Sequence, residues 1–125
     1  MVSHPDPLIE SSSLTSITPI PLVYFPHDDL VNRVIQPRLL SGSQLETVLR
    51  ASQRHEQRLY TGERMGFFLG DGAGVGKGRQ LAGIILENWS RGRHRHVWLS
   101  ASRDLERDAR RDLDDIGCTD ILSRW

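Results

Sequence analysis

Met65-Gly-Phe-Phe-Leu-Gly-Asp-Gly-Ala-Gly-Val-Gly-Lys-Gly-Arg79 is the stretch that decides the fold of this chain. Glycine stands at every second position from Gly70 to Gly78, around a single lysine, Lys77. The apolar run before the glycines predicts a short buried strand, and the periodic run after them predicts a helix. Glycines let backbone N–H groups turn toward a phosphate, while a lysine and a helix N-terminus add positive charge. The pattern therefore predicts a phosphate-binding loop and, with it, nucleotide binding.

The loop departs from the usual pattern G-x-x-x-x-G-K-[ST] at two positions. Asp71 stands where that pattern has its first glycine, and Gly78 stands where it has a hydroxyl residue. A shorter helicase spacing, closed by Gly74-Val-Gly-Lys77, fits better. The missing hydroxyl would be one Mg²⁺ ligand, so its loss weakens the case for tight metal binding without removing it. The alternative is a flexible glycine linker, which rarely lies between a strand pattern and a helix pattern.

Composition bounds the chain to one domain at most. Its 125 residues carry 16 basic and 16 acidic side chains, so no global charge would hold nucleic acid or an anionic membrane. A single cysteine, Cys118, excludes an internal disulfide framework. No signal-peptide pattern opens the sequence, and no stretch approaches the roughly 20 apolar residues of a membrane span. We therefore expect a soluble intracellular protein with no membrane partner.

Residues 1–40 are predicted to form an extended arm and linker. This region holds several prolines and a serine-rich run, and shows little periodicity. Such an arm cannot build a core alone and would lie over a larger folded body. The apolar side chains that could anchor it are Leu8, Ile9, Leu14, Ile17 and Leu22.

After the arm, helical and strand patterns alternate. The order strand, helix, strand, helix implies a right-handed parallel crossover, with a ligand at the carboxyl ends of the strands. We therefore predict an α/β fold with a parallel sheet and flanking helices. Its predicted elements are a helix over 43–58 that begins with a Ser43/Glu46 capping box; a strand over 65–69; a helix after the glycine loop that buries Leu81, Ile84, Ile85 and Trp89; a strand over 96–100; a helix that is capped by Ser102, buries Leu105, Ala109, Leu113 and Ile116, and stops at Gly117; and the start of a third strand over 120–125.

Two charged clusters are predicted to be ordinary surface. Residues 91–96 form a basic patch near two tryptophans, and a solvated helix-to-strand connection explains it better than nucleic-acid contact. Asp112, Asp114 and Asp115 are predicted to be solvated charges at a helix end. No metal-ligand or nucleophile spacing occurs, so the sequence predicts neither a metal site built from protein ligands nor a catalytic residue.

Four segments of the chain resemble the strawberry notch family. They are residues 4–16, residues 40–46 with 53–56, the loop from Gly70 to Arg79 with its continuation to Asn88, and residues 98–117. The loop ending in Gly-Lys-Gly-Arg79 is the most specific segment. Because that family has the same four residues there, Gly78 resembles a family trait more than a decayed motif.

The resemblance implies the N-terminal part of a P-loop NTPase in residues 41–125, with a superfamily-two helicase-like, RecA-type lobe. It implies that Gln44 reads adenine and that Ser100 contacts a nucleic-acid backbone. A solvated helix residue for Gln44, and a plain strand-end residue for Ser100, remain as alternatives. The residues implied to bind ATP together with Mg²⁺ are Gly72, Ala73, Gly74, Val75, Gly76, Lys77, Gly78 and Arg79.

The family further implies a nuclear role in transcription regulation, with DNA or chromatin and transcription regulators as partners of the full-length protein. The acidic Asp-Glu box, arginine finger and second lobe of such ATPases have no counterpart in this sequence. Because phosphoryl transfer relies on all of these parts, we do not expect the chain alone to hydrolyse ATP usefully, and its status as an enzyme stays open.

Three hypotheses follow. The first is the nucleotide-binding portion of a strawberry-notch-like ATPase. The second is a truncated, non-hydrolysing fragment that acts only as a binding or interaction module. The third is another ATP-dependent enzyme, such as a kinase, which would share the loop but not the flanking segments.

Overall fold

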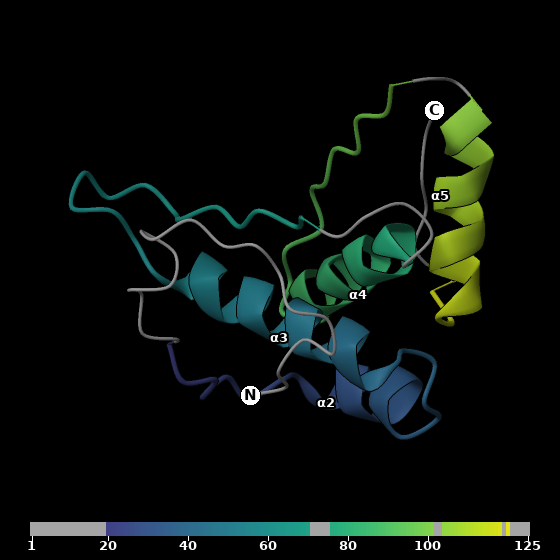
Figure 1. The fold of residues 1–125 in the computed structure, drawn as a ribbon, viewed down its shortest axis with the longest axis horizontal. Helices are drawn as coiled ribbons and strands as arrows, with labels where there is room; N and C mark the ends of the chain where they lie inside the picture. Colours follow the sequence, from purple (N-terminus) through teal and green to yellow (C-terminus); the bar gives the residue numbers. More distant parts are fainter. Residues whose placement is uncertain (1–19, 71–75, 102–103, 119, 121–125) are drawn as a thin grey trace, which may run out of the picture.

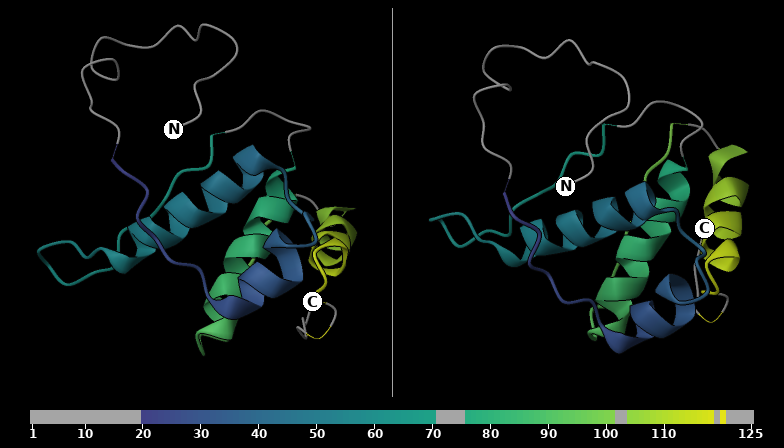
Figure 2. Two further views of the ribbon diagram at one scale, coloured as in Figure 1. Left: turned by 90° about the horizontal axis from the view of Figure 1, so that it is seen from below. Right: turned by 60° about the horizontal axis from the view of Figure 1, so that its bottom comes forward.

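A computed structural model describes residues 20–70, 76–101, 104–118 and 120 of the chain (Figure 1). Its helices are α2 (Asp28–Leu30), the π-helix η1 (Val31–Ile35), α3 (Gly42–Glu56), α4 (Lys77–Ser90) and α5 (Asp104–Asp115). Helix α4 is central, because α2, α3 and α5 all pack against it. Two further views show α3 crossing α4 and α5 standing beside it (Figure 2).

Helix α3 begins one residue earlier than predicted, and its capping pair is different. The Ser41 hydroxyl accepts a hydrogen bond from the Gln44 backbone N–H at 3.2 Å, and the Ser41 N–H donates to Gln44 Oε1 at 2.9 Å. The predicted Ser43/Glu46 box is therefore wrong. Ser41 is extended, with φ −67° and ψ 166°, as an N-cap residue must be, while Ser43 already lies inside the first helical turn.

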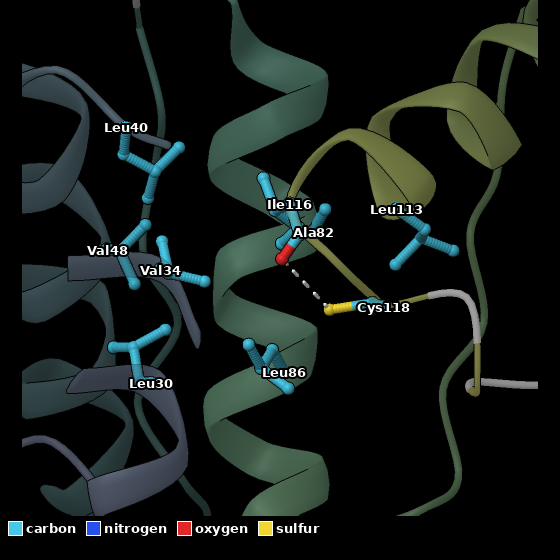
Figure 3. Packing of buried hydrophobic residues seen from close by; sticks show 9 residues of the cluster. All are labelled: Leu30, Val34, Leu40, Val48, Ala82, Leu86, Leu113, Ile116 and Cys118. Carbon is cyan, nitrogen blue, oxygen red and sulfur yellow. Dashed lines mark hydrogen bonds between the residues drawn. The ribbon is translucent and has the colours of Figure 1, made fainter. Parts of the chain in front are cut away.

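The core lies where α2, η1, α3 and α5 meet α4 (Figure 3). Helix α3 approaches α4 closely at Gly83, where an added Cβ would lie 3.0 Å from Val48 Cγ2 and 3.4 Å from Leu40 Cδ1. Helix α5 ends as predicted, with Gly117 in the left-handed region at φ 79° and the Cys118 N–H donating to the Leu113 carbonyl at 2.8 Å. The core comprises Leu30, Val34, Leu40, Val48, Ala82, Leu86, Leu113, Ile116 and Cys118.

The face of α4 that was predicted to be buried against a sheet is only partly covered. Leu81 is 37% exposed, whereas Ala82 and Leu86, which were not in the predicted stripe, are fully buried. The predicted stripe instead borders a groove, whose other wall is the segment 96–99. Helix α4 is thus apolar on two sides. Ala82 and Leu86 lie in the helical core, and Ile84, Ile85 and Trp89 of the predicted stripe are partly buried against it.

The parallel sheet is not present among the described residues, so the strands predicted at 65–69 and 96–100 are corrected. Both segments run without strand pairing, and the single bridge is an antiparallel one between Arg58 and Arg64. Phe68, Val97 and Leu99 are 88%, 85% and 89% exposed. Parallel strands need neighbours for their N–H and C=O groups and cover on both faces, and the described segments provide neither.

Residues 20–27 cross the outside of α3 before α2 begins (Figure 2). Side chains of α3 hold the backbone of this segment. Gln53 donates from Nε2 to the Pro21 carbonyl at 3.0 Å and accepts the Val23 N–H at 2.7 Å. Arg50 donates to the Ile20 carbonyl at 2.8 Å. Residues 20–27 therefore lie on a folded body, held by backbone hydrogen bonds. Residues 28–35 of the predicted extended arm are instead helical and bring Leu30 and Val34 into the core. The other predicted anchors, at positions 8, 9, 14 and 17, lie outside the described residues.

Candidate functional site

The site begins at the N-terminus of α4. Gly76 is the N-cap residue, with φ 76° and ψ 41° in the left-handed region that glycine adopts without a steric penalty. No side chain on the cap residue satisfies the first N–H groups of the helix, and the first turn carries no acidic residue. Lys77, the first helical residue, is exposed. This arrangement suits an anion, because orphan N–H groups, the helix dipole and an ammonium group lie at one place. Of the predicted loop, residues 72–75 lie outside the described part of the chain.

Gln44 lies beside the loop, although it comes from a different helix. A Cβ added to Gly76 would collide with Gln44 Nε2 and lie 3.5 Å from Gln44 Cδ. The amide oxygen of Gln44 accepts the Ser41 N–H at 2.9 Å, so the capping box fixes the orientation of the amide group. The structure therefore places Gln44 against Gly76, so that two of the predicted nucleotide contacts are neighbours. Whether Gln44 reads adenine stays a prediction.

Arg79 points away from the loop toward neighbouring elements. Its Nη1 donates to the Leu39 carbonyl at 3.3 Å, and its Nη2 lies 3.8 Å from Asp115 Oδ2. These contacts tie α4 to the segment before α3 and to α5. The structure gives Arg79 a structural task, and its predicted contact with the nucleotide stays untested.

Asp112 is not a solvated helix-end charge, which corrects the sequence prediction. Its carboxylate faces Gly78 in the first turn of α4, where a Cβ on that glycine would collide with Asp112 Oδ2 and lie 2.7 Å from Asp112 Cγ. Burial raises the pKa of Asp112, and the positive charge of Arg111 partly opposes that shift. The hydroxyl position of the usual loop pattern is thus filled from α5. No local sequence signal predicts this contact, because it depends on how two helices pack.

Ser100 and the basic patch lie in the connection between α4 and α5. Ser100 is exposed in the segment that precedes α5, and its proposed nucleic-acid contact stays a prediction. In the patch, the His94 ring stacks on Trp89 with centroids 4.1 Å apart, and Arg93 donates to Asn88 Oδ1 at 2.8 Å. These side chains therefore bind back onto the end of α4.

Sequence reasoning missed Glu87, which is fully buried in α4. Its carboxylate accepts the His27 N–H at 2.7 and 3.1 Å and the Arg91 Nε–H at 2.9 Å. The available signal is the spacing of four residues between Glu87 and Arg91, which is also the spacing of ordinary surface pairs on helices.

Comparison with known proteins shows to which family the chain belongs. A family model described as P-loop containing NTP hydrolase pore-1 matches residues 3–123. Protein strawberry notch homolog 1 of Gallus gallus is 53% identical over 119 residues, which cover 95% of this chain and 9% of that protein. Protein FORGETTER 1 of Arabidopsis thaliana is 50% identical over 116 residues, which cover 93% of this chain and 9% of that protein. The chain belongs to the strawberry notch family.

Membership of the strawberry notch family confirms the resemblance seen in the sequence and supports the P-loop NTP hydrolase fold. The chain spans about 9% of the length of these relatives. No solved structure matches it. None of the helices in the described part of the chain is long and apolar enough to cross a membrane.

Proposed function

We propose that the N-terminus of α4 binds the phosphates of ATP, with Lys77 as the charged contact and Gln44 beside the base. The observation that carries this proposal is the exposed Lys77 at a helix start capped by a left-handed glycine, in a chain that matches a P-loop NTP hydrolase family. Backbone N–H groups would hold the phosphate oxygens, and the ammonium group would neutralise part of their charge.

The residues fit a nucleotide accompanied by Mg²⁺. At the start of α4, the space that side chains would fill at Gly76 and Gly78 is taken by the Gln44 amide and the Asp112 carboxylate, which bring a hydrogen-bond donor and an oxygen ligand beside the loop. Among the described residues, no group of three His, Cys, Asp or Glu side chains could hold a metal ion. Mg²⁺ would therefore arrive with the phosphates, as it does in sites that use one or two carboxylates and several waters. When bound, it would neutralise phosphate charge.

Nucleotide binding is tested with a fluorescent ATP analogue and the Lys77→Ala variant. Losing a charge-assisted contact of about 1.5–3 kcal/mol should weaken binding about 10- to 100-fold. Arg107→Ala is the matched control, since it removes one exposed positive charge from α5. Binding that survives Lys77→Ala would remove the loop from the proposal.

A second measurement uses the fact that Lys77 is the only lysine in the sequence. An amine-reactive reagent can modify only the ε-amino group of Lys77 and the α-amino group. ATP should protect Lys77 and leave the α-amino group reactive, which serves as an internal control in mass spectrometry. If ATP leaves the labelling of Lys77 unchanged, the proposed phosphate contact is contradicted.

For the whole protein we propose an ATPase of the helicase type that regulates DNA-templated transcription through chromatin in the nucleus. This part rests on family resemblance. A non-hydrolysing binding module is the alternative, and DNA-stimulated ATP turnover by the longer protein distinguishes the two. A Lys77→Ala variant of the longer protein should lose that turnover, whereas unchanged turnover would assign the activity to another site.

A further inference from the structure

The starting observation is the position of the Asp112 carboxylate relative to Gly78. From a Cβ placed on Gly78, the nearest atoms are Asp112 Oδ2, then Cγ at 2.7 Å, then Cβ at 3.5 Å. The Asp112 side chain thus points head-on at the glycine. In the usual loop pattern this is the position of the Ser or Thr whose hydroxyl is a Mg²⁺ ligand.

The Asp112 carboxylate feels the positive charges of Arg111 and Arg79, but both of these arginines pair with other groups. Arg79 pairs with Asp115 at 3.8 Å and donates to the Leu39 carbonyl, and Arg111 pairs with Asp108 at 3.3 Å. Within the described residues, no hydrogen bond or ion pair engages the Asp112 carboxylate. Its oxygens are therefore available to another partner.

Charge indicates what that partner is. A carboxylate beside a phosphate-binding helix start would repel a triphosphate, and this repulsion becomes an attraction only if a cation lies between them. Mg²⁺ prefers oxygen ligands and is commonly held by one or two carboxylates together with phosphate oxygens and waters.

We propose that Asp112 supplies, from α5, the oxygen ligand for nucleotide-bound Mg²⁺ that a loop hydroxyl supplies in the usual motif, and that Gly78 keeps the space for it. This inference rests on the proposed nucleotide binding at Lys77. It assigns the site a metal ligand from a neighbouring helix, where the loop sequence alone shows a missing one.

The experiment measures how much Mg²⁺ strengthens binding of the fluorescent ATP analogue to the full chain, from titrations in excess Mg²⁺ and in excess EDTA. Asp112→Asn should lower this strengthening by roughly 10- to 100-fold, the usual cost of disturbing a metal's ligand environment. In EDTA the same variant should bind the analogue as well as the wild type or better, because a negative charge is gone. Asp114→Asn is the matched control, since it removes an exposed acidic charge from the same helix.

A rescue variant separates the metal from mere stabilisation of the helix start. Gly78→Ser combined with Asp112→Ala restores the usual hydroxyl pattern and removes the collision. It should recover most of the strengthening by Mg²⁺. If Asp112 only stabilises the N-terminus of α4, Asp112→Asn will weaken binding equally with and without Mg²⁺, and that result overturns the inference while leaving nucleotide binding intact. No binding by the wild-type chain in either condition would overturn the proposed function and this inference together.

Discussion

Replacing Glu87 tests how the first described segment is attached to the helical core. The Glu87 side chain is 1% exposed, and its carboxylate receives the His27 N–H and the Arg91 guanidinium. Arg91 in turn donates to the Phe25 carbonyl at 2.7 Å and lies over the Tyr24 ring, 5.2 Å from its centroid. One buried carboxylate therefore joins α4 to the residues that lead into α2.

Glu87→Ala should lower the free energy of unfolding by about 3 kcal/mol. Leaving the His27 N–H without a partner costs about 1–3 kcal/mol, and losing a hydrogen bond to a charged group costs about 1.5–3 kcal/mol. Arg91 is 29% exposed, so water offsets part of the second cost. Glu87→Gln keeps an acceptor oxygen for the His27 N–H and should cost about half as much, since it loses mainly the charge.

Urea denaturation followed by circular dichroism measures these changes. Glu46→Ala is the matched control, because Glu46 pairs with Arg50 through the same i,i+4 geometry at 3.0 Å but is 23% exposed. A pair in this i,i+4 helix geometry, which water still reaches from both partners, contributes about 0.3–0.5 kcal/mol. Equal effects of the two alanine substitutions would refute the reasoning, because burial would then have no influence on the contribution of the pair.

Three further outcomes are expected. Gly76→Ala should lower the free energy of unfolding by about 1–2 kcal/mol, because its backbone is left-handed, and it should also weaken ATP binding, because the new Cβ collides with Gln44. Gly62→Ala, at φ 93° with open space around it, should lower stability in thermal unfolding but leave the ATP titration unchanged. Desolvation, with Glu87 nearby, raises the pKa of Tyr24 from 10.0 to about 12, so the folded state keeps this proton to a higher pH than the unfolded state. The stability that this proton contributes should be fully present below pH 10 and be lost as the pH rises toward 12. In a pH series of urea midpoints, Tyr24→Phe should flatten that loss. Burial raises the pKa of Cys118 to about 11, so iodoacetamide should modify it at pH 8 far more slowly in the folded protein than in urea, and equal rates would contradict its burial.

The helices were largely predictable because their signals are local. Periodic apolar residues located the three long helices to within one or two residues at the ends that were predicted, and Gly117 marked the end of α5. The capping pair was misplaced because two overlapping Ser-x-x-polar patterns, at Ser41 and Ser43, compete for one helix start. Such a choice is decided by which serine can stay extended, and sequence alone does not show it.

That the segments 65–69 and 96–100 form no strands could not be predicted from these segments alone. An apolar run such as 65–69 favours a strand only if neighbouring strands satisfy its N–H and C=O groups. Among the described residues those neighbours are absent, so Phe68 remains exposed and the apolar stripe of α4 borders a groove. The same stripe misled the choice of buried face. The Glu87 pair was missed for a related reason, since its burial depends on α2 and the segment before it.

Gly76 and Gly78 have two different physical explanations, and only one of them is visible in the sequence. Gly76 is needed for its positive φ, which a motif argument can anticipate. Gly78 is an ordinary helical residue, and what excludes a side chain there is the carboxylate of Asp112. A hydroxyl residue at position 78 would therefore require the Asp112 side chain to move. The missing hydroxyl residue at position 78 is therefore linked to the approach of Asp112 from α5. Restoring the hydroxyl without removing Asp112 should impair nucleotide binding at the loop.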